Sequence, residues 1–187
     1  MAKRLFDIVF SIIALVFLGW IILLSWFLAA FDTKTNGLFL QKRVGQSGKL
    51  FTIFKLRTIR KNKEGISSIS RLGAFLRNSK LDELPQFVNV LLGEMSIVGP
   101  RPDIEGYYDC LKGEERKILE LKPGLTSEAS LKYFNEEQLL AMQDNPLEYN
   151  DLVLFPDKVR LNLQYYYEHT FFGDLKIIAK TLFHKMF

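Results

Sequence analysis

The sequence predicts an α+β protein, in which an N-terminal re-entrant membrane helix precedes a small, mostly helical domain with a short β-hairpin and amphipathic interfacial helices. Three observations predict this architecture. A run of 24 uncharged residues, 8–31, comes first; positive residues flank both of its ends; and short aromatic and β-branched segments separated by turn residues follow it. The charged residues return at the boundary between the predicted membrane helix, 1–33, and the second domain, 34–187.

Length and composition restrict the class of protein. The 187 residues suffice for one domain with a proper core and an appendage, but not for two full domains. A net charge of +4 favours anionic partners such as phosphates, nucleic acid or acidic lipid. The sequence shows no recognition-helix or zinc pattern, so we expect no nucleic-acid partner. The single cysteine, Cys110, excludes an internal disulfide framework.

The uncharged run is long enough for a membrane. At about 1.5 Å per residue it forms a helix of roughly 36 Å, and a bilayer hydrocarbon core is about 30 Å thick. A buried core helix is disfavoured because both faces of the run are apolar. A cleaved signal peptide is disfavoured because the run is long for one and lacks a small-x-small cleavage site.

Charge at both ends of the run bears on its orientation. The positive-inside bias favours keeping both ends in the cytoplasm, which a straight span cannot do. A helix that enters one leaflet, bends and returns satisfies the bias, and Gly19 near the midpoint is the flexible residue for such a bend. The flanking cations are Lys3, Arg4, Lys34, Lys42, Arg43 and Lys49.

The remaining elements follow from periodicity and turn residues. A hairpin is predicted over 37–59, because the strand-like segments on either side of the turn-like GQSGK are aromatic and β-branched. Apolar residues at helical spacing predict a helix over 69–81, and a second helix over 83–94 stops at Gly93. Further helices are predicted over 113–124, 135–143 and 157–169.

The C-terminal segment 173–187 is amphipathic. Its apolar stripe consists of Leu175, Ile178, Leu182 and Met186, and its basic stripe of Lys176, Lys180 and His184. A basic amphipathic helix beside an aromatic cluster suits an anionic membrane surface. A core-packing helix with a solvated basic face fits the same pattern equally well, and the sequence leaves both interpretations open.

Two adjacent carboxylates, Asp82 and Glu83, lie in the stretch NSKLDELPQF. A structural interpretation makes Ser79 the cap of a helix, with Asp82 three residues on completing a capping box. Pro85 disfavours that position of the cap, because it would fall beyond the first turn; a cap at Asp82 would place the proline in the first turn. In either case the acids lie at a helix entrance or a bend.

The cations around the two carboxylates favour a catalytic role for Asp82 and Glu83 over a purely structural one. Lys55 and Arg57 alternate in a strand pattern and so are expected on one face, while two prolines hold Arg101 on an extended turn. Arg77 and Lys80 precede the acids by five and two positions. Cations around paired carboxylates are what metal-dependent phosphoryl transfer needs: acids for a divalent ion or as nucleophile, and cations for diphosphate oxygens.

Several longer motifs resemble one family. KRLFDIVFS, QKRVG, FTIFKLRTI, LDELPQFVNVLLGEMSIVGPRP, KPGLTSEASL and FFGDLKII have the order and spacing of the bacterial sugar transferases, the monotopic phosphoglycosyl transferases. The resemblance covers nearly the whole chain, and the block from LDELPQF to GPRP is highly specific. It implies transfer of a sugar 1-phosphate from a UDP-sugar to a polyprenyl phosphate, usually undecaprenyl phosphate, with Mg²⁺ and release of UMP. It also implies a catalytic domain resting on the cytoplasmic face of the bacterial inner membrane.

The resemblance also implies residue roles. The family's acidic dyad falls on Asp82 and Glu83, with Asp82 as the nucleophile that forms a covalent aspartyl phosphosugar. Glu83 would hold Mg²⁺ or orient the nucleophile, and both acids are expected near the metal. The residues expected to bind the substrate phosphates are Lys55, Arg57, Arg77, Arg101 and Lys122.

The chain departs from the family pattern in two of these places. Lys122 stands where relatives often have arginine, so it would bind phosphate without a bidentate contact. Gly19 and Trp20 stand where the family's membrane helix typically breaks at Ser-Pro, so re-entrance depends here on the flanking charges.

A non-catalytic membrane-anchored basic domain, binding acidic lipid or scaffolding a polysaccharide complex, is the alternative to the enzyme. The sequence leaves open the choice of UDP-sugar, the glycan pathway and the question of a homodimer.

Overall fold

A computed structural model describes residues 2–61 and 64–183. The chain divides into two compact units, each built from two stretches of sequence. The first unit comprises Met1–Arg43 and Phe51–Glu94, and the second comprises Val44–Leu50 and Met95–Phe187. Helices and short strands occur in both units, so the mixed helical and strand architecture expected from the sequence is confirmed.

The first unit contains the long N-terminal helix and the dyad. Its elements are α1 (Ala2–Thr33), the paired strands β1 (Leu38–Val44) and β2 (Leu50–Leu56), the antiparallel pair β3 (Ile59–Lys61) and β4 (Ser67–Ile69), α2 (Arg71–Asn78), the 3-10 turn η2 (Leu81–Glu83) and α3 (Gln86–Leu92). The predicted hairpin is thus present as β1 and β2. Its turn end, which comprises the last residue of β1, the 3-10 turn η1 (Gln46–Gly48) and the first residue of β2, belongs to the second unit.

Helix α1 has its small and polar side chains inside and its large apolar side chains outside. The buried positions are Asp7, Ser11, Ala14, Ser25, Ala29 and Thr33. On the outer face Phe17 is 70% exposed and Phe31 is 81% exposed. A helix of a water-soluble protein has the opposite distribution, because its apolar stripe packs against the core. Within the described residues α1 is the one helix long and apolar enough to cross a membrane.

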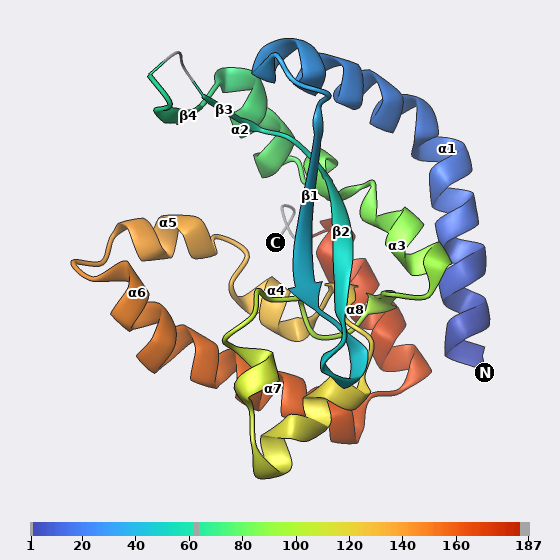
Figure 1. Ribbon diagram of the computed structural model, residues 1–187. Coiled ribbons are helices and arrows are strands. Elements are labelled where there is room, and N and C mark those ends of the chain that lie inside the picture. The colour runs from blue at the N-terminus through green and yellow to red at the C-terminus, as the bar shows by residue number, and fades with distance from the viewer. Residues whose placement is uncertain (1, 62–63, 184–187) are drawn as a thin grey trace. The chain divides into compact units, whose positions relative to one another are not determined.

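Both ends of α1 are fixed to the rest of the first unit. At the N-terminal end the Arg4 guanidinium donates to the carbonyl oxygens of Val90 at 2.6 Å and Leu91 at 2.9 Å. At the other end Asp32 Oδ2 accepts a hydrogen bond of 2.6 Å from the Ser70 hydroxyl. Between these ends, residues 15–24 include no buried residue. Figure 1 shows α1 as one unbroken, curved ribbon whose concave side faces α2 and α3, and the helix continues through Gly19 without interruption.

The connection from α2 to α3 differs from both positions considered for a helix cap. Ser79 ends α2, and its hydroxyl donates back to the Phe75 carbonyl at 2.7 Å, so it caps no following helix. Asp82 lies inside η2 rather than at the cap position, and Pro85 precedes the first residue of α3. Both predicted caps are therefore wrong. The chain reverses at a left-handed Lys80, with φ +59°, a conformation that local sequence patterns seldom predict for lysine.

Helix α3 ends at the position that the sequence predicts. Gly93 has φ +86° and donates its N–H to the Asn89 and Val90 carbonyls. Glycine tolerates this left-handed conformation without a Cβ clash, so it is favoured at the end of a helix. The stop predicted at Gly93 is confirmed.

The second unit packs short helices around a small parallel sheet. Its elements are β5 (Ser96–Val98), η3 (Tyr108–Cys110), η4 (Gly113–Glu120), β6 (Gly124–Thr126), α4 (Glu128–Lys132), α5 (Glu136–Ala141), α6 (Pro146–Tyr149), the π-helical turn η5 (Asn150–Leu154), α7 (Phe155–Glu168) and α8 (Phe171–Phe183). The helix predicted over 113–124 is a 3-10 helix.

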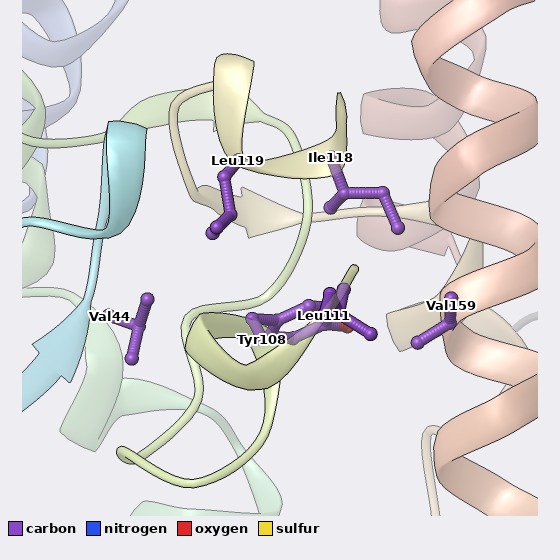
Figure 2. Packing of buried hydrophobic residues seen from close by; sticks show 6 residues of the cluster. All are labelled: Val44, Tyr108, Leu111, Ile118, Leu119 and Val159. Atoms are coloured by element: carbon purple, nitrogen blue, oxygen red, sulfur yellow. The ribbon is translucent and has the colours of Figure 1, made fainter. Parts of the chain in front are cut away.

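Figure 2 shows a core cluster of this unit in which six buried residues come from four parts of the chain. They are Val44, Tyr108, Leu111, Ile118, Leu119 and Val159. Val44, at the end of β1, is 3% exposed, and its N–H donates to the Asp103 carbonyl at 2.9 Å. The hairpin end is thus part of the hydrophobic core of the second unit.

Two glycines allow the strands of the small sheet to approach closely. A Cβ placed on Gly124 would lie 2.1 Å from the Gly99 nitrogen, and one placed on Gly99 would lie 2.3 Å from the Lys122 carbonyl oxygen. Because backbone atoms cannot yield to such overlap, larger residues are excluded at both positions. This contact holds the segments that carry Arg101 and Lys122 beside each other, since the Gly124 N–H donates to the Pro100 carbonyl at 2.8 Å.

Helix α8 buries Asp174, Ile177 and Ile178 against the second unit. Leu175 and Leu182 of the predicted apolar stripe are 36% and 71% exposed, so the stripe divides between a packed and an unpacked face. Met186 and His184, the last members of the two predicted stripes, lie outside the described residues.

Candidate active site

The two carboxylates lie in the tight turn between α2 and α3. Lys80 in the left-handed region turns the chain, and Leu81–Glu83 then form a single 3-10 turn. Asp82 is 8% exposed, and the Glu83 side chain is 13% exposed. The prediction that the acids lie at a bend before a helix is confirmed, although the caps are not.

Glu83 has a cationic partner from the β-hairpin. Lys55 Nζ, on β2, donates to Glu83 Oε1 at 2.8 Å, and the exposed fractions of the two side chains are 18% and 13%. Partial burial strengthens such a pair relative to one at the surface, because water screens it less. The pair joins β2 to the turn that carries Asp82.

Asp82 differs from its neighbour because its Oδ1 atom is buried with no hydrogen-bond partner among the residues that the structure describes. Burial, together with the adjacent charge of Glu83, raises the pKa of Asp82 to about 6. The positive charges of Lys55, Lys80 and Arg77 act in the opposite direction, lowering that pKa. Asp82 is thus a carboxylate with an uncommitted oxygen and three cations close enough to influence it.

The raised pKa predicts a pH dependence of stability. Because the pKa of Asp82 is about 6 in the folded protein against 3.8 when unperturbed, the folded state binds the proton more tightly. The contribution of Asp82 is therefore fully present below about pH 4 and is lost as pH rises through 6, with a total loss of about 3 kcal/mol. We expect the stability difference between wild type and Asp82→Asn to change by nearly that amount between pH 3 and 7.5, measured by urea unfolding without divalent ions. A difference independent of pH would contradict the raised pKa.

Arg57 is held away from this group. Its Nε donates to the Leu38 carbonyl oxygen at 3.2 Å, and its guanidinium lies 5.8 Å from the centre of the Phe39 ring. Arg57 lies just beyond the end of β2, so strand alternation does not determine where its side chain points. Arg57 is also not among the charges that shift the pKa of Asp82. The structure brings together Asp82, Glu83, Lys55 and Arg77, whereas the Arg57 side chain contacts Leu38 and Phe39 of β1.

Arg101 and Lys122 belong to the second unit. Arg101 lies after β5 between two prolines, in a segment that is neither helix nor strand, and lines a small hollow of about 20 Å³ with Pro100 and Pro102. Lys122 lies two residues before the start of β6. The close contact at Gly99 and Gly124 holds the backbones of these two cations near each other.

The family resemblance implies Mg²⁺, and the donor set can be tested against that ion. No group of three or more His, Cys, Asp or Glu side chains suited to a metal occurs in residues 2–61 and 64–183. Mg²⁺ commonly binds through one or two carboxylates and completes its shell with water and substrate phosphates. The unpartnered Asp82 oxygen, with Glu83 next to it, fits such an ion. The residues do not form a closed all-protein cage.

Two residues of α3 were not recognised from the sequence. Gln86 is 3% exposed and Asn89 is 0% exposed, and they follow Asp82 at spacings of four and seven residues. Polar residues at that spacing on a buried helix face, among apolar neighbours, are the signal that identifies them. The helix predicted over 83–94 rests on its apolar residues and on the stop at Gly93, which carry no information about these two amides.

Comparison with known proteins identifies the family. The family model described as bacterial sugar transferase matches residues 1–187. The chain is 32% identical over 203 residues to the galactosyl transferase CpsE of Streptococcus agalactiae serotype III, an alignment that covers 97% of the chain and 41% of the relative. It is 32% identical over 195 residues to the UDP-glucose:undecaprenyl-phosphate glucose-1-phosphate transferase of Klebsiella pneumoniae, covering 97% and 39%.

A shorter relative aligns over most of its length. It is the uncharacterized sugar transferase EpsL of Bacillus subtilis, with 30% identity over 187 residues, 96% of the chain and 85% of the relative. The chain therefore spans about two fifths of the first two relatives and most of the third. With a family model that matches the whole chain and relatives aligned along nearly all of it, the protein belongs to the bacterial sugar transferase family.

Proposed function

We propose that this protein transfers a sugar 1-phosphate from a UDP-sugar to a polyprenyl phosphate, releasing UMP, by way of a covalent intermediate on Asp82. The observation that carries the proposal is the buried Asp82 carboxylate, which has one oxygen without a partner and lies within the electrostatic influence of Lys55, Lys80 and Arg77. The name of the Klebsiella relative specifies transfer of glucose 1-phosphate from UDP-glucose to undecaprenyl phosphate, and the Streptococcus relative is named as a galactosyl transferase.

In the first half-reaction an Asp82 oxygen attacks the β-phosphorus of the UDP-sugar. The bond from that phosphorus to the bridging oxygen breaks, and UMP leaves with the electron pair. In the second half-reaction a phosphate oxygen of the polyprenyl phosphate attacks the same phosphorus, and the Asp82 carboxylate leaves. The sugar phosphate is thereby transferred and the enzyme is regenerated.

Charge neutralisation is the main contribution of the surrounding residues. A carboxylate is a weak nucleophile, so the rate must come from positioning and from cations that stabilise charge on the phosphoryl oxygens. We assign this role to Lys55 and Arg77, whose charges act on Asp82, and Lys80 adds a third charge. Bound Mg²⁺ would supply further neutralisation of the diphosphate, held by Asp82 and Glu83. From the family motif, Arg57, Arg101 and Lys122 remain proposed phosphate-binding residues.

We also propose that α1 enters and leaves the membrane on the same, cytoplasmic face. A straight helix of 32 residues would be about 48 Å long, and its ends would lie on opposite sides of a core of about 30 Å. Here Arg4 near one end and Asp32 near the other both bond to residues of the first unit, while residues 15–24 in the middle of the helix include no buried residue. The exposed Phe172 and Leu182 of α8 supply an apolar surface for the membrane interface in the second unit.

This topology predicts the accessibility of both termini. We expect epitope tags at the N-terminus and at the C-terminus to be cleaved by protease in inside-out vesicles and to survive in spheroplasts. A periplasmic tagged protein serves as the control for intact spheroplasts. Cleavage of the N-terminal tag in spheroplasts would establish a true span instead.

The transfer reaction is tested with purified protein in nanodiscs. UMP release is followed with UDP-glucose, UDP-galactose and their N-acetyl derivatives, with Mg²⁺ or EDTA, and with undecaprenyl phosphate present or absent. We expect about one equivalent of UMP without the acceptor, turnover with it, and neither in EDTA. Absence of UMP with every donor would overturn the proposal and favour a non-catalytic domain that binds acidic lipid.

A further inference from the structure

Three buried polar residues follow one another along the dyad turn and α3. Asp82, Gln86 and Asn89 are separated by four and three positions, and their exposed fractions are 8%, 3% and 0%. Leu84 and Pro85 between them have right-handed helical backbone angles, so the spacing brings successive side chains of the series near each other. Polar groups in such a position require hydrogen-bond partners, because burial removes their water.

Asn89 has all the partners it needs. Its Oδ1 accepts from the Phe54 N–H at 3.0 Å, and its Nδ2 donates to the Thr52 carbonyl at 2.7 Å and to Glu94 Oε2 at 2.7 Å. The first two contacts fasten α3 to β2, the strand that carries Lys55. Asn89 is therefore a structural residue.

Gln86, one turn earlier, has no such partner. Its Nε2 is buried and makes no hydrogen bond with the residues that the structure describes, and Asp82 Oδ1 is unpartnered in the same way. A buried donor and a buried acceptor thus lie at neighbouring positions without bonding to each other. A ligand that satisfies both must present a hydrogen-bond acceptor to the amide while it contacts the carboxylate oxygen.

We propose that Gln86 Nε2 donates a hydrogen bond to a phosphoryl oxygen of the sugar phosphate that is attached to Asp82. This inference rests on the proposed function and assigns to that site a catalytic residue. A phosphoryl group bonded to the Asp82 oxygen has further oxygens that accept hydrogen bonds, which a bare cation does not. The amide is neutral, and its hydrogen bond is directional. It therefore fixes the orientation of the phosphoryl group, while Lys55 and Arg77 supply the positive charge that neutralises it.

The test compares Gln86→Met and Gln86→Leu with wild type in the first half-reaction. UMP release in a single turnover is measured without acceptor, using the UDP-sugar that wild type converts fastest. We expect the release rate to fall about 100-fold in both variants, as when one donor to a developing oxyanion is removed, with KM for the UDP-sugar nearly unchanged. The thermal midpoint should stay the same or rise, because an unpartnered buried donor has been removed. Gln164→Met, which removes an exposed amide on α7, is the matched control and should behave as wild type.

Each other result overturns the inference. A release rate within threefold of wild type in either folded variant would show that the amide does not contact the phosphoryl group. A lowered thermal midpoint, or loss of folded protein in both variants, would show that the amide holds a structural water instead. Absence of UMP release in wild type would overturn the proposed function and this inference with it, whereas equal release by wild type and variants overturns the inference alone.

Discussion

Replacing Asp82 by asparagine is expected to abolish UMP release and the covalent adduct while leaving the protein folded. The amide has nearly the shape of the carboxylate but cannot act as a nucleophile toward phosphorus. The rate should therefore fall by at least about 10⁴-fold, as when the nucleophile of a covalent enzyme is removed. The adduct is detected by mass spectrometry of the intact protein after mixing with UDP-sugar and Mg²⁺.

Stability separates this loss from misfolding. The substituted amide would carry no charge in a site where burial raises the pKa of the carboxyl to about 6, so the Asp82→Asn variant should be at least as stable as wild type at pH 7.5. Asp144→Asn, at an exposed aspartate, is the matched control and should retain full activity. A sugar-phosphate adduct that persists on the Asp82→Asn protein would exclude Asp82 as the nucleophile.

A second large effect is expected at Asn89, where replacement by leucine should cost about 3–5 kcal/mol of folding free energy. Leucine leaves the Phe54 N–H, the Thr52 carbonyl and the Glu94 carboxylate without the partner that the amide provides. Each of these groups then incurs a desolvation penalty that water compensates poorly in a buried site. The loss is measured as a lower urea midpoint at an unchanged slope.

The effect at Asn89 should contrast with that at Gln86, which has similar chemistry and similar burial. Gln86→Met is expected to lose activity and keep its stability, whereas Asn89→Leu is expected to lose stability. An unchanged urea midpoint for Asn89→Leu would mean that β2 and α3 are held together by apolar packing alone.

Local sequence signals predicted the elements whose causes are local. The uncharged run produces α1, the turn residues between two β-branched segments produce the hairpin, and Gly93 ends α3 because it tolerates a positive φ. In each case the residues that determine the structure lie within a few positions of it, so periodicity and turn chemistry are sufficient.

The turn that carries the dyad could not be predicted in this way. Ser79 bonds back to the helix that precedes it, and a left-handed Lys80 has no local signature. The candidate site depends further on long-range contacts, since Lys55 meets Glu83 across 28 positions of sequence. Strand alternation likewise did not determine the direction of Arg57, because the strand ends one residue before it. The identity of the nucleophile came from the longer motif and the family resemblance, and it remains a prediction.

The end of the β-hairpin also has a consequence for how such a chain can be inherited. The second unit needs Val44, which lies in its core with Leu111 and Val159, yet Val44 is encoded far ahead of the stretch that begins at Met95. A recombination event that joined only the segment from Met95 onward to another gene would deliver a core with one buried side chain missing. The two stretches are therefore expected to be inherited together, because the core of the second unit needs a residue from each of them.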